Sequence, residues 1–263
     1  MDHQTVAAYL RRIGAGPAGP PDARLLRELH ARHLTTVPFE NLGIHLDEPI
    51  TLDEDALLDK IIRRRRGGFC YELNGAFGAL LEALGFRVTR LAARTIGPDG
   101  TLGVPFDHLV LLVELDERWL ADVGFGRHTR HPLRLDWPDP QADPDGTFLV
   151  LDAPTGDVDV LRDGEPQYRL ERRPRTLDDF RAGCWWHQTS PTSHFTAGPT
   201  CSMATPDGRI TLAGNRLIRT EGAHRTETVL EDDAAVLAAY RAEFGFTLDR
   251  VPRNPATQLA AAE

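Results

Sequence analysis

The sequence predicts an α+β protein, because the spacing of its apolar residues changes twice along the chain. Residues 1–86 repeat apolar side chains at the three- and four-residue intervals of amphipathic helices. From Arg87 onward, short runs of strand-forming residues are separated by segments rich in proline, glycine and aspartate. After residue 200, short strands are followed by a closing helical pattern.

The first third of the chain carries four helical patterns. Thr51 and Glu54 have the spacing of a capping box, which predicts a helix that continues to about Arg65. Gly67 and Gly68 follow and are expected to end it, as glycines past a helix C-terminus commonly do. The apolar positions of the other three patterns are Val6, Tyr9, Leu10 and Ile13; Leu25, Leu26 and Leu29; and Ala76, Leu80, Leu81 and Leu84.

One cysteine stands at the beginning of the last of these helices. Cys70 lies between the glycine pair and the apolar positions, at or near the first turn. Unpaired backbone N–H groups and the positive end of the helix dipole favour an anion there, so such a position lowers the pKa of a thiol. The alternative is a small buried hydrophobic residue, which free cysteine often is. The cysteine alone leaves both interpretations open.

A β-hairpin in the middle of the chain contains a histidine and an aspartate. His108 begins an apolar run that ends at Leu115, and strand character resumes at 118–123. A two-residue turn between the strands would leave His108 and Asp122 on opposite faces. A three-residue turn would make them diagonal neighbours on one face, within reach of each other's side chains. The hairpin must therefore have an odd turn or a bulge if the two residues act together.

Cys70, His108 and Asp122 are the residue types of a cysteine-based catalytic triad. The nucleophile needs a base that takes its proton, and the base needs a carboxylate that holds the imidazole in one tautomer. Each partner alone also has a structural explanation, as a satisfied histidine at a strand end and as a turn carboxylate bonded to the backbone. The joint arrangement favours catalysis.

The remaining elements follow the same rules. Thr176 and Asp179 mark the beginning of another helix, and a closing helix is expected over about 232–244. Cys184 and Cys201 are interpreted as packing residues, because three separated cysteines form no disulfide framework. Further strands are expected near 87–95, 147–151, 158–162, 200–204, 209–213 and 216–220.

Several segments resemble the signature segments of the arylamine N-acetyltransferases, in the same order along the chain. The most specific is Arg66-Gly-Gly-Phe-Cys-Tyr-Glu-Leu-Asn74, and the strand that begins at His108 and the segment 119–126 are two more. The matches cover most of the chain, between about residues 5 and 220. The other matching segments are 37–42, 190–196, 201–205 and 207–212.

The resemblance implies a fold of three parts with a triad arrangement like that of cysteine proteases and transglutaminases. An N-terminal helical bundle over 1–86 would carry the cysteine, and a central antiparallel β-barrel over 87–200 would carry the histidine and the aspartate. An α/β lid would follow over 201–263. The residues that the resemblance assigns are Cys70, His108 and Asp122 as catalytic, Phe39 and Phe125 as aromatics of the acceptor pocket, and Gly126 where the pantetheine arm of coenzyme A passes.

The activity that the resemblance implies is acetyl-CoA-dependent N-acetyltransfer to arylamines, arylhydrazines or arylhydroxylamines. Acetyl-CoA would leave its acetyl group on Cys70 as a thioester before the amine attacks, which is a ping-pong order. One alternative on the same scaffold is an amide synthase that releases a carrier-bound polyketide chain as a macrolactam. A non-catalytic binder that retains the fold is a third hypothesis, and the intact triad speaks against it.

Two local features depart from the family pattern. Asp107 precedes His108, where a threonine or another small residue is usual. Its carboxylate either favours the charged imidazole or points to solvent, and the second is expected because charged residues are seldom buried unpaired. After Gly126, a basic stretch at 127–131 replaces a small, glycine-containing turn. It is interpreted either as a group that holds coenzyme A phosphates or an acidic substrate, or as a solvated loop.

The charge and composition of the chain exclude some classes of binding partner. The net charge of −9 argues against nucleic-acid binding as the main role, and four arginines at 63–66 are interpreted as a group that suits the negative end of a helix. No apolar run reaches membrane-spanning length and the first residues lack the features of a signal peptide, so a cytoplasmic location is expected. No metal is expected, because the histidines near Cys184 lack compact ligand spacing. Whether the chain forms a homodimer is left open.

Overall fold

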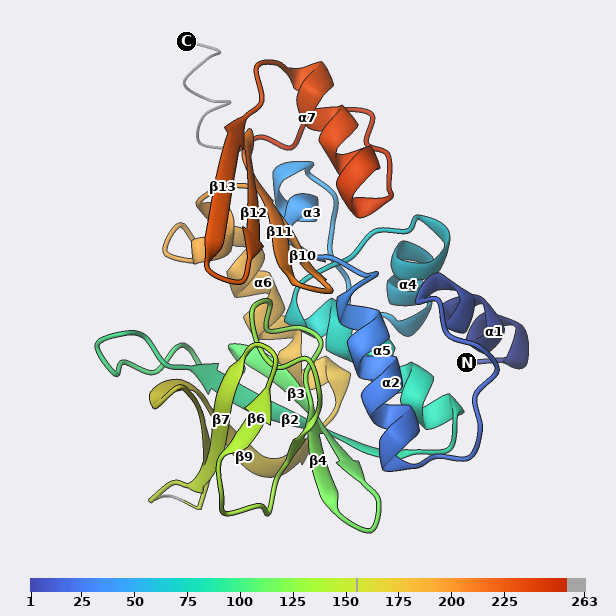
Figure 1. Ribbon diagram of the computed structural model, residues 1–263, viewed down its shortest axis with the longest axis vertical. Helices are drawn as coiled ribbons and strands as arrows, with labels where there is room; N and C mark the ends of the chain where they lie inside the picture. Colours follow the sequence, from blue (N-terminus) through green and yellow to red (C-terminus); the bar gives the residue numbers. More distant parts are fainter. Residues whose placement is uncertain (155, 255–263) are drawn as a thin grey trace.

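The first third of the chain is helical, as predicted, in the computed structural model, which describes residues 1–154 and 156–254 (Figure 1). The first two helices begin after Asp2 and Asp22, whose carboxylates accept the backbone N–H three residues further on. The helices of this part are α1 (His3–Arg12), α2 (Ala23–Leu34), α3 (Leu42–His45), α4 (Glu54–Leu58), the π-helical turn η1 (Asp59–Arg63) and α5 (Cys70–Ala83).

The helix formed by α4 and η1 begins and ends at residues other than those predicted. Asp53, and not Thr51, accepts the backbone N–H three residues further on, at 3.2 Å, because it stands in extended conformation directly before the first turn. The chain leaves the helix through Arg65, whose φ of 55° is left-handed. Gly67 does not end the helix but allows the backbone to pass close to Pro38, since a Cβ there would lie 1.7 Å from the carbonyl oxygen of Pro38.

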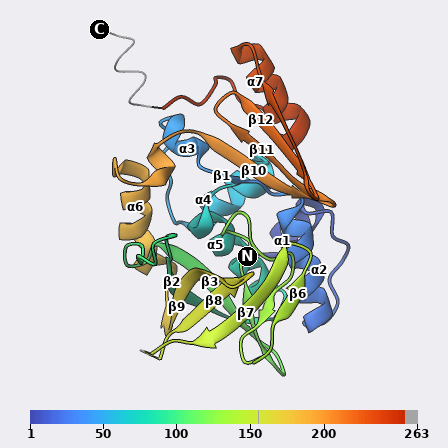
Figure 2. The ribbon, with the colours of Figure 1, turned by 60° about the vertical axis from the view of Figure 1, so that its left-hand side comes forward.

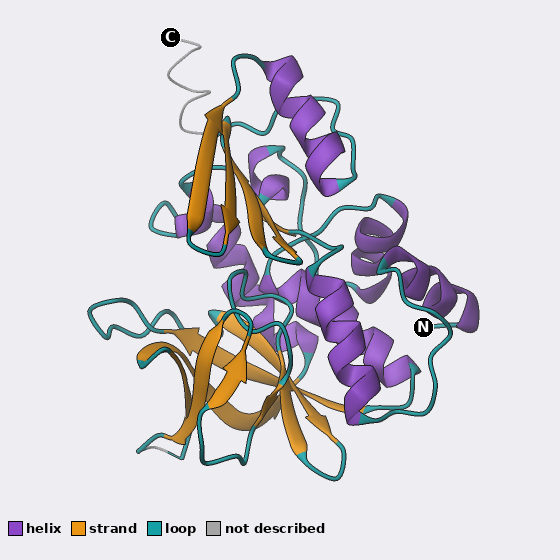
Figure 3. Cartoon of the chain, in the orientation of Figure 1, coloured by secondary structure: helices purple, strands orange, loops and turns teal. Residues whose placement is uncertain are grey.

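Eight antiparallel strands form a strongly curved, barrel-like sheet in the middle of the sequence (Figures 1 and 3). Their order is β5-β4-β3-β2-β9-β8-β7-β6. Apolar side chains from several of these strands, with Tyr168 and Phe148 among the largest, form one buried cluster. The strands are β2 (Arg87–Thr95), β3 (His108–Glu114), β4 (Arg118–Ala121), β5 (Leu133–Arg134), β6 (Gln141–Asp143), β7 (Gly146–Asp152), β8 (Val158–Arg162) and β9 (Glu165–Arg175).

A second antiparallel sheet combines the end of the chain with one early strand. Strand β1 (Phe39–Glu40) pairs with β10 (Thr200–Thr205), which places the early segment 37–42 at the edge of the late sheet. The other members are β11 (Gly208–Ala213), β12 (Arg216–Glu221) and β13 (His224–Val229), and the helices of this half are η2 (Leu177–Phe180), α6 (Arg181–Thr189), η3 (His194–Thr196), α7 (Asp233–Ala239) and η4 (Tyr240–Phe244).

Helix α5 lies between the two sheets (Figure 2). Its side chains belong to the largest buried cluster, which also takes in apolar residues of β3 and of α6. Cys184 lies in this cluster and Cys201 in the core under the second sheet, so both are packing residues, as predicted. The α+β class is confirmed. Among the described residues, no helix is both long and apolar enough to cross a membrane.

Candidate active site

The β3–β4 hairpin brings His108 and Asp122 together. Backbone pairing places Glu114 opposite Arg118, so the turn has the three residues 115–117. This is the longer of the two turns considered above, and it puts the two side chains on one face. His108 Nε2 lies 2.7 Å from Asp122 Oδ2, and the two side chains are 4% and 2% exposed. The imidazole is therefore oriented by a buried carboxylate.

Asp122 is also held by helix α5, through Asn74. The amide of Asn74 donates to Asp122 Oδ1 at 2.8 Å, and the backbone N–H of Gly124 donates to the same oxygen at 3.0 Å. Burial raises the pKa of Asp122, but His108 and these donors outweigh it, so the pKa lies well below its ordinary value. Asn74 was not predicted as a site residue, although its place four residues after Cys70 puts it on the same helix face.

Cys70 is the first residue of α5, and it lies next to Asp107, before β3, and next to Gly124, after β4. Its Sγ is 3.9 Å from the carbonyl oxygen of Asp107, the residue before His108. On the other side, a Cβ on Gly124 would lie 2.7 Å from the Cα of Cys70, so the turn after Asp122 packs directly on this backbone. The fold thus brings the three predicted triad residues into one buried site.

The environment of the Cys70 thiol differs from the expectation for an exposed helix end. Burial raises its pKa well above the ordinary value, and the carboxylates of Asp107 and Asp122 add to this. The backbone N–H of Leu109 opposes them. The predicted lowering is therefore wrong for the thiol on its own, because desolvation outweighs the helix end. A thiolate at this depth needs a positive charge beside it, which a protonated His108 would supply.

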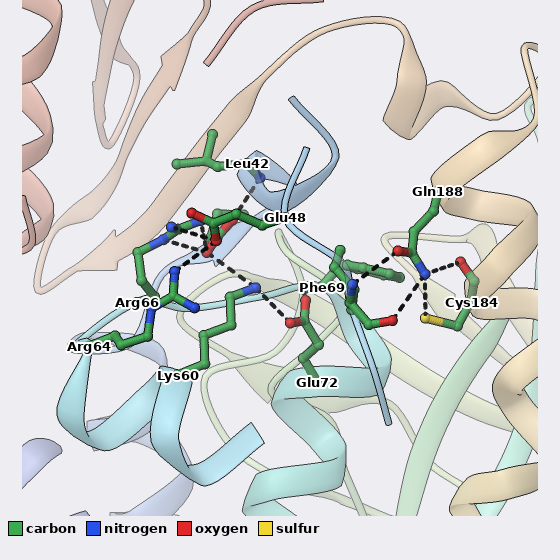
Figure 4. A network of polar contacts seen from close by, with 11 residues as sticks. Leu42, Glu48, Lys60, Arg64, Arg66, Phe69, Glu72, Cys184 and Gln188 are labelled. Carbon is green, nitrogen blue, oxygen red and sulfur yellow. Dashed lines mark hydrogen bonds and ion pairs between the residues drawn. The ribbon is translucent and has the colours of Figure 1, made fainter. Parts of the chain in front are cut away.

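A buried network of charges fixes the beginning of α5 (Figure 4). Glu72 accepts the backbone N–H of Phe69 at 3.1 Å with one oxygen and Lys60 Nζ at 2.6 Å with the other. Lys60 also lies 3.6 Å from Glu40, which accepts Arg66 Nε at 3.0 Å. The network therefore joins the backbone before Cys70 to strand β1.

The charges of this network compensate one another. Burial raises the pKa of Glu40, but Arg66 and Lys60 outweigh it and hold the pKa at about 2. Arg66 is 2% exposed. The interpretation of 63–66 as a helix-end group is therefore wrong for Arg66, which is needed as the partner of a buried carboxylate.

The predicted binding residues lie around this site. The Phe125 ring meets the His108 ring edge-on at 5.2 Å between centroids. Gly126 has a φ of 93°, a left-handed conformation that glycine adopts without cost, and a Cβ there would be 3.8 Å from the Phe39 ring. Phe39 and Phe125 thus approach the site from different elements, β1 and the turn after β4.

The basic stretch 127–131 is built into the protein. His128, Thr129 and Arg130 are buried, so the solvated-loop alternative is wrong for these three residues. Arg130 pairs with Asp145 and donates to two backbone carbonyl groups of the β10–β11 turn. The stretch therefore connects the barrel-like sheet to the second sheet.

A pocket of about 420 Å³ opens beside this stretch and is rich in arginine. Arg209, which is largely buried, donates to the carbonyl oxygen of Gly126 at 2.7 Å. Burial and the neighbouring arginines lower its pKa to about 10, although Asp145 opposes them. The charged residues that line the pocket are Arg127, Arg130, Arg162, Arg209, Asp145 and Asp207.

Asp107 does not point to solvent as expected. Its side chain is buried and accepts the backbone N–H of Thr95 at 3.0 Å, together with the Thr95 hydroxyl. His187 Nε2 lies 3.1 Å from its other carboxylate oxygen. The expectation failed because the partners come from distant segments, and no spacing in the sequence pointed to His187.

Comparison with known proteins identifies the family of this chain. A family model described as N-acetyltransferase matches residues 22–252. The arylamine N-acetyltransferase of Mycolicibacterium smegmatis is 38% identical over 256 residues, which cover 92% of each chain. The solved structure from Salmonella typhimurium has a TM-score of 0.88 at 31% identity and covers 99% of this chain and 98% of its own. The Mycobacterium marinum enzyme, solved in complex with CoA, has a TM-score of 0.83 at 34% identity, with 92% of each chain covered. This chain belongs to the arylamine N-acetyltransferase family.

Proposed function

We propose that this protein transfers the acetyl group of acetyl-CoA to the nitrogen of an arylamine, arylhydrazine or arylhydroxylamine. The observation that carries the proposal is the position of Cys70 at the first turn of α5, in the buried site that also holds the His108–Asp122 pair. Membership of the family supports the same reaction. Cys70 is the nucleophile, His108 the base and Asp122 the residue that orients the base.

In the first half-reaction, His108 takes the thiol proton as the Cys70 sulfur attacks the carbonyl carbon of the acetyl thioester. Asp122 stabilises the imidazolium that forms. The bond between the acetyl carbon and the coenzyme A sulfur then breaks, and His108 returns the proton to the leaving thiolate. Backbone N–H groups of Cys70 and Tyr71, at the beginning of α5, are the donors we assign to the developing oxyanion.

In the second half-reaction, the acceptor nitrogen attacks the acetyl-Cys70 thioester. His108 takes the proton from the nitrogen and gives it to the departing Cys70 sulfur, which restores the thiol. The two half-reactions share one site, so coenzyme A leaves before the acceptor reacts, in a ping-pong order. The rings of Phe39 and Phe125 would contact the aromatic ring of the acceptor.

The arginine-rich pocket is where we place the phosphates of coenzyme A. Its cations exceed its carboxylates, and Arg209 connects it to Gly126, where the pantetheine arm is expected to pass. Arginine is well suited to phosphate groups because its planar guanidinium donates in pairs.

The proposal is tested by intact-protein mass spectrometry after mixing with acetyl-CoA in the absence of an acceptor. We expect one acetyl group on the wild type and none on Cys70→Ala, and we expect the group to be lost when an arylamine is added. Absence of the adduct, with Cys70 still alkylated quickly, would reject acetyl-CoA as the donor. Carrier-bound acyl chains, the donors of the macrolactam-forming alternative, would then be tried.

Three features of the chain stay predictions. They are its division at residues 86 and 200 into bundle, barrel and lid, its cytoplasmic location, and a homodimer. Sedimentation velocity at several protein concentrations would decide the last of these.

A further inference from the structure

A second buried imidazole–carboxylate pair lies beside Cys70. His187 Nε2, on helix α6, is 3.1 Å from Asp107 Oδ1 and 3.1 Å from the carbonyl oxygen of the same residue. His187 is 1% exposed and Asp107 7%. Burial raises the pKa of Asp107, but His187 and Thr95 outweigh it and hold the pKa below its ordinary value. The carboxylate is therefore ionised and fully partnered.

The partners of His187 orient its ring at both ends. Because the oxygens of Asp107 accept, Nε2 carries a proton and donates. Nδ1 faces the hydroxyl of Ser193 at 3.2 Å. The ring also packs on Phe69 and Tyr71, the two residues that flank the proposed nucleophile, at centroid distances of 6.2 and 6.0 Å. This imidazole has one well-defined orientation.

An uncommon turn lies directly ahead of His108 and ends at the Asp107 of this pair. Phe106 has a φ of 59°, a left-handed conformation that residues with a Cβ rarely adopt. The Tyr71 hydroxyl donates to the Phe106 carbonyl oxygen at 2.6 Å. Gly183 of α6 allows the approach, because a Cβ there would lie 2.6 Å from that oxygen. Contacts from two helices thus maintain strained backbone beside the proposed base.

The carbonyl oxygen of Asp107 is the point where this turn meets the nucleophile. Three groups with a proton face it: Cys70 Sγ at 3.9 Å, His187 Nε2 at 3.1 Å, and the Tyr71 hydroxyl at 3.0 Å, whose single proton is shared with the Phe106 carbonyl oxygen. A carbonyl oxygen has two lone pairs, and a thiol is a weaker donor than a hydroxyl or an imidazole. When His187, with a share of the Tyr71 proton, occupies the oxygen, the thiol proton is left for another acceptor.

We propose that His187, held by Asp107, is a positioning residue that fixes the 106–107 turn and leaves the Cys70 thiol proton to His108. The inference rests on the roles proposed above for Cys70 and His108. The titratable groups that act on Cys70 are Tyr71 on α5, Asp107 before β3, Asp122 after β4 and Cys184 on α6. His187 and His108 are bonded to the two carboxylates of this set, Asp107 and Asp122.

Two variants separate the two nitrogens of His187. In His187→Gln the amide nitrogen falls near the position of Nε2 and can still donate to Asp107, whereas in His187→Asn it falls near Nδ1 and cannot. His194→Asn is the matched control, because it removes an exposed histidine that touches the His187 ring and has only a long-range electrostatic interaction with Asp107. The measurement is the rate of Cys70 alkylation by iodoacetamide between pH 5 and 10, with peptide mass spectrometry to identify the alkylated cysteine.

We expect His187→Gln and His194→Asn to alkylate within about threefold of the wild type at every pH. His187→Asn should be about tenfold slower at pH 7, with the midpoint of its pH profile about one unit higher, since the thiolate fraction changes tenfold per pH unit. Equal profiles for the Gln and Asn variants, both folded by circular dichroism, would overturn the proposal. An equal loss in His194→Asn would overturn it as well.

Tyr71→Phe keeps the proposal open to refutation if the His187 variants do not fold. It removes the other donor to the Asp107 carbonyl, and we expect its alkylation at pH 7 to be about threefold slower. An unchanged rate in this variant would count against the inference. Iodoacetamide needs no coenzyme A, so these results do not depend on acetyl transfer. A wild type that alkylates normally but forms no acetyl-Cys70 would count against the proposed function alone.

Discussion

The amide of Asn74 donates to the Asp122 carboxylate at 2.8 Å, so the helix that begins with the nucleophile holds the last residue of the triad. The same side chain donates to the Leu109 carbonyl at 2.7 Å and accepts the Val123 N–H at 2.9 Å. Asn74 is therefore the link that joins α5 to strand β3 and to the turn after β4.

Replacing this link with Asn74→Ala should damage the site and the fold together. Each polar group left buried without a partner costs about 1–3 kcal/mol. The variant leaves the Leu109 carbonyl, the Asp122 carboxylate and the Val123 N–H without their Asn74 partner. We expect lower resistance to urea and about a tenfold loss of kcat, because the imidazole loses its fixed carboxylate. Asn215→Ala, which removes an exposed amide bonded to the Leu230 carbonyl, is the control and should be close to wild type. A normal kcat in a folded Asn74→Ala would show that Asp122 needs no second anchor.

Lys60 is the cation between two buried carboxylates, Glu72 and Glu40. Lys60→Met keeps most of the side-chain volume but leaves a buried negative charge uncompensated, which typically costs about 3–5 kcal/mol. We expect a loss of unfolding free energy of that size in urea titration. Arg63→Met, at an arginine whose side chain is 78% exposed, should change stability by less than about 0.5 kcal/mol. Equal losses in the two variants would contradict the role of the network.

The folded-state pKa of Glu40 predicts how the stability that this network provides changes in acid. Its folded-state pKa of about 2 lies below the ordinary value of 4.5, so its stabilising contribution is present above pH 4.5 and is lost as the pH falls toward 2. Glu72 acts in the opposite sense, because burial raises its pKa. Comparison with Glu40→Gln isolates the first effect. The variant should be less stable than the wild type at pH 7, and the difference in unfolding free energy should shrink between pH 5 and pH 3. A difference that stays constant over this range would assign the loss to packing instead of charge.

The sequence predicts those parts of the fold whose signal is local. Strands at 87–95 and 158–162 have the predicted bounds, because apolar runs bounded by turns determine them. Strand β9 was not predicted, since it is rich in charged residues and contains Pro166 and Pro174, and it becomes a strand by pairing with β2 and β8. Its extended form is a tertiary effect that local propensity does not contain.

The residues of the site also divide into those that the sequence predicts and those that it does not. Strand parity reduces the relation between His108 and Asp122 to two turn lengths, and the structure has the one that puts them on the same face. Buried charges are harder to predict, because their partners lie far away in the chain: Arg66 meets Glu40 and Asp107 meets His187. A sequence shows that a charge is present, whereas only the fold shows that it has been paired.

The arginine-rich pocket predicts a preference for the nucleotide part of the donor. Arg127→Ala removes an exposed cation from the pocket, and we expect the KM for acetyl-CoA to rise about fivefold at low salt. The KM for acetyl-pantetheine, which lacks the phosphates, should not change, and neither should kcat. Arg63→Ala is the control for a general loss of positive charge. An equal rise for both donors would place the phosphates elsewhere.

The pairing of β3 with β4, and not the length of the turn between them, places His108 and Asp122 on one face. Deleting Asp116 shortens the turn 115–117 to two residues but leaves Glu114 opposite Arg118, so every residue of both strands keeps its face. We expect a less stable but folded protein whose kcat stays within about threefold of the wild type, since the imidazole keeps its carboxylate. Asp116→Gly, which keeps the length of the turn, is the control. A kcat reduced about a thousandfold in the folded deletion variant would show that the turn itself positions the pair. Asp122→Asn in the deletion background should lower kcat as much as it does in the wild type, because the same pair still orients the imidazole.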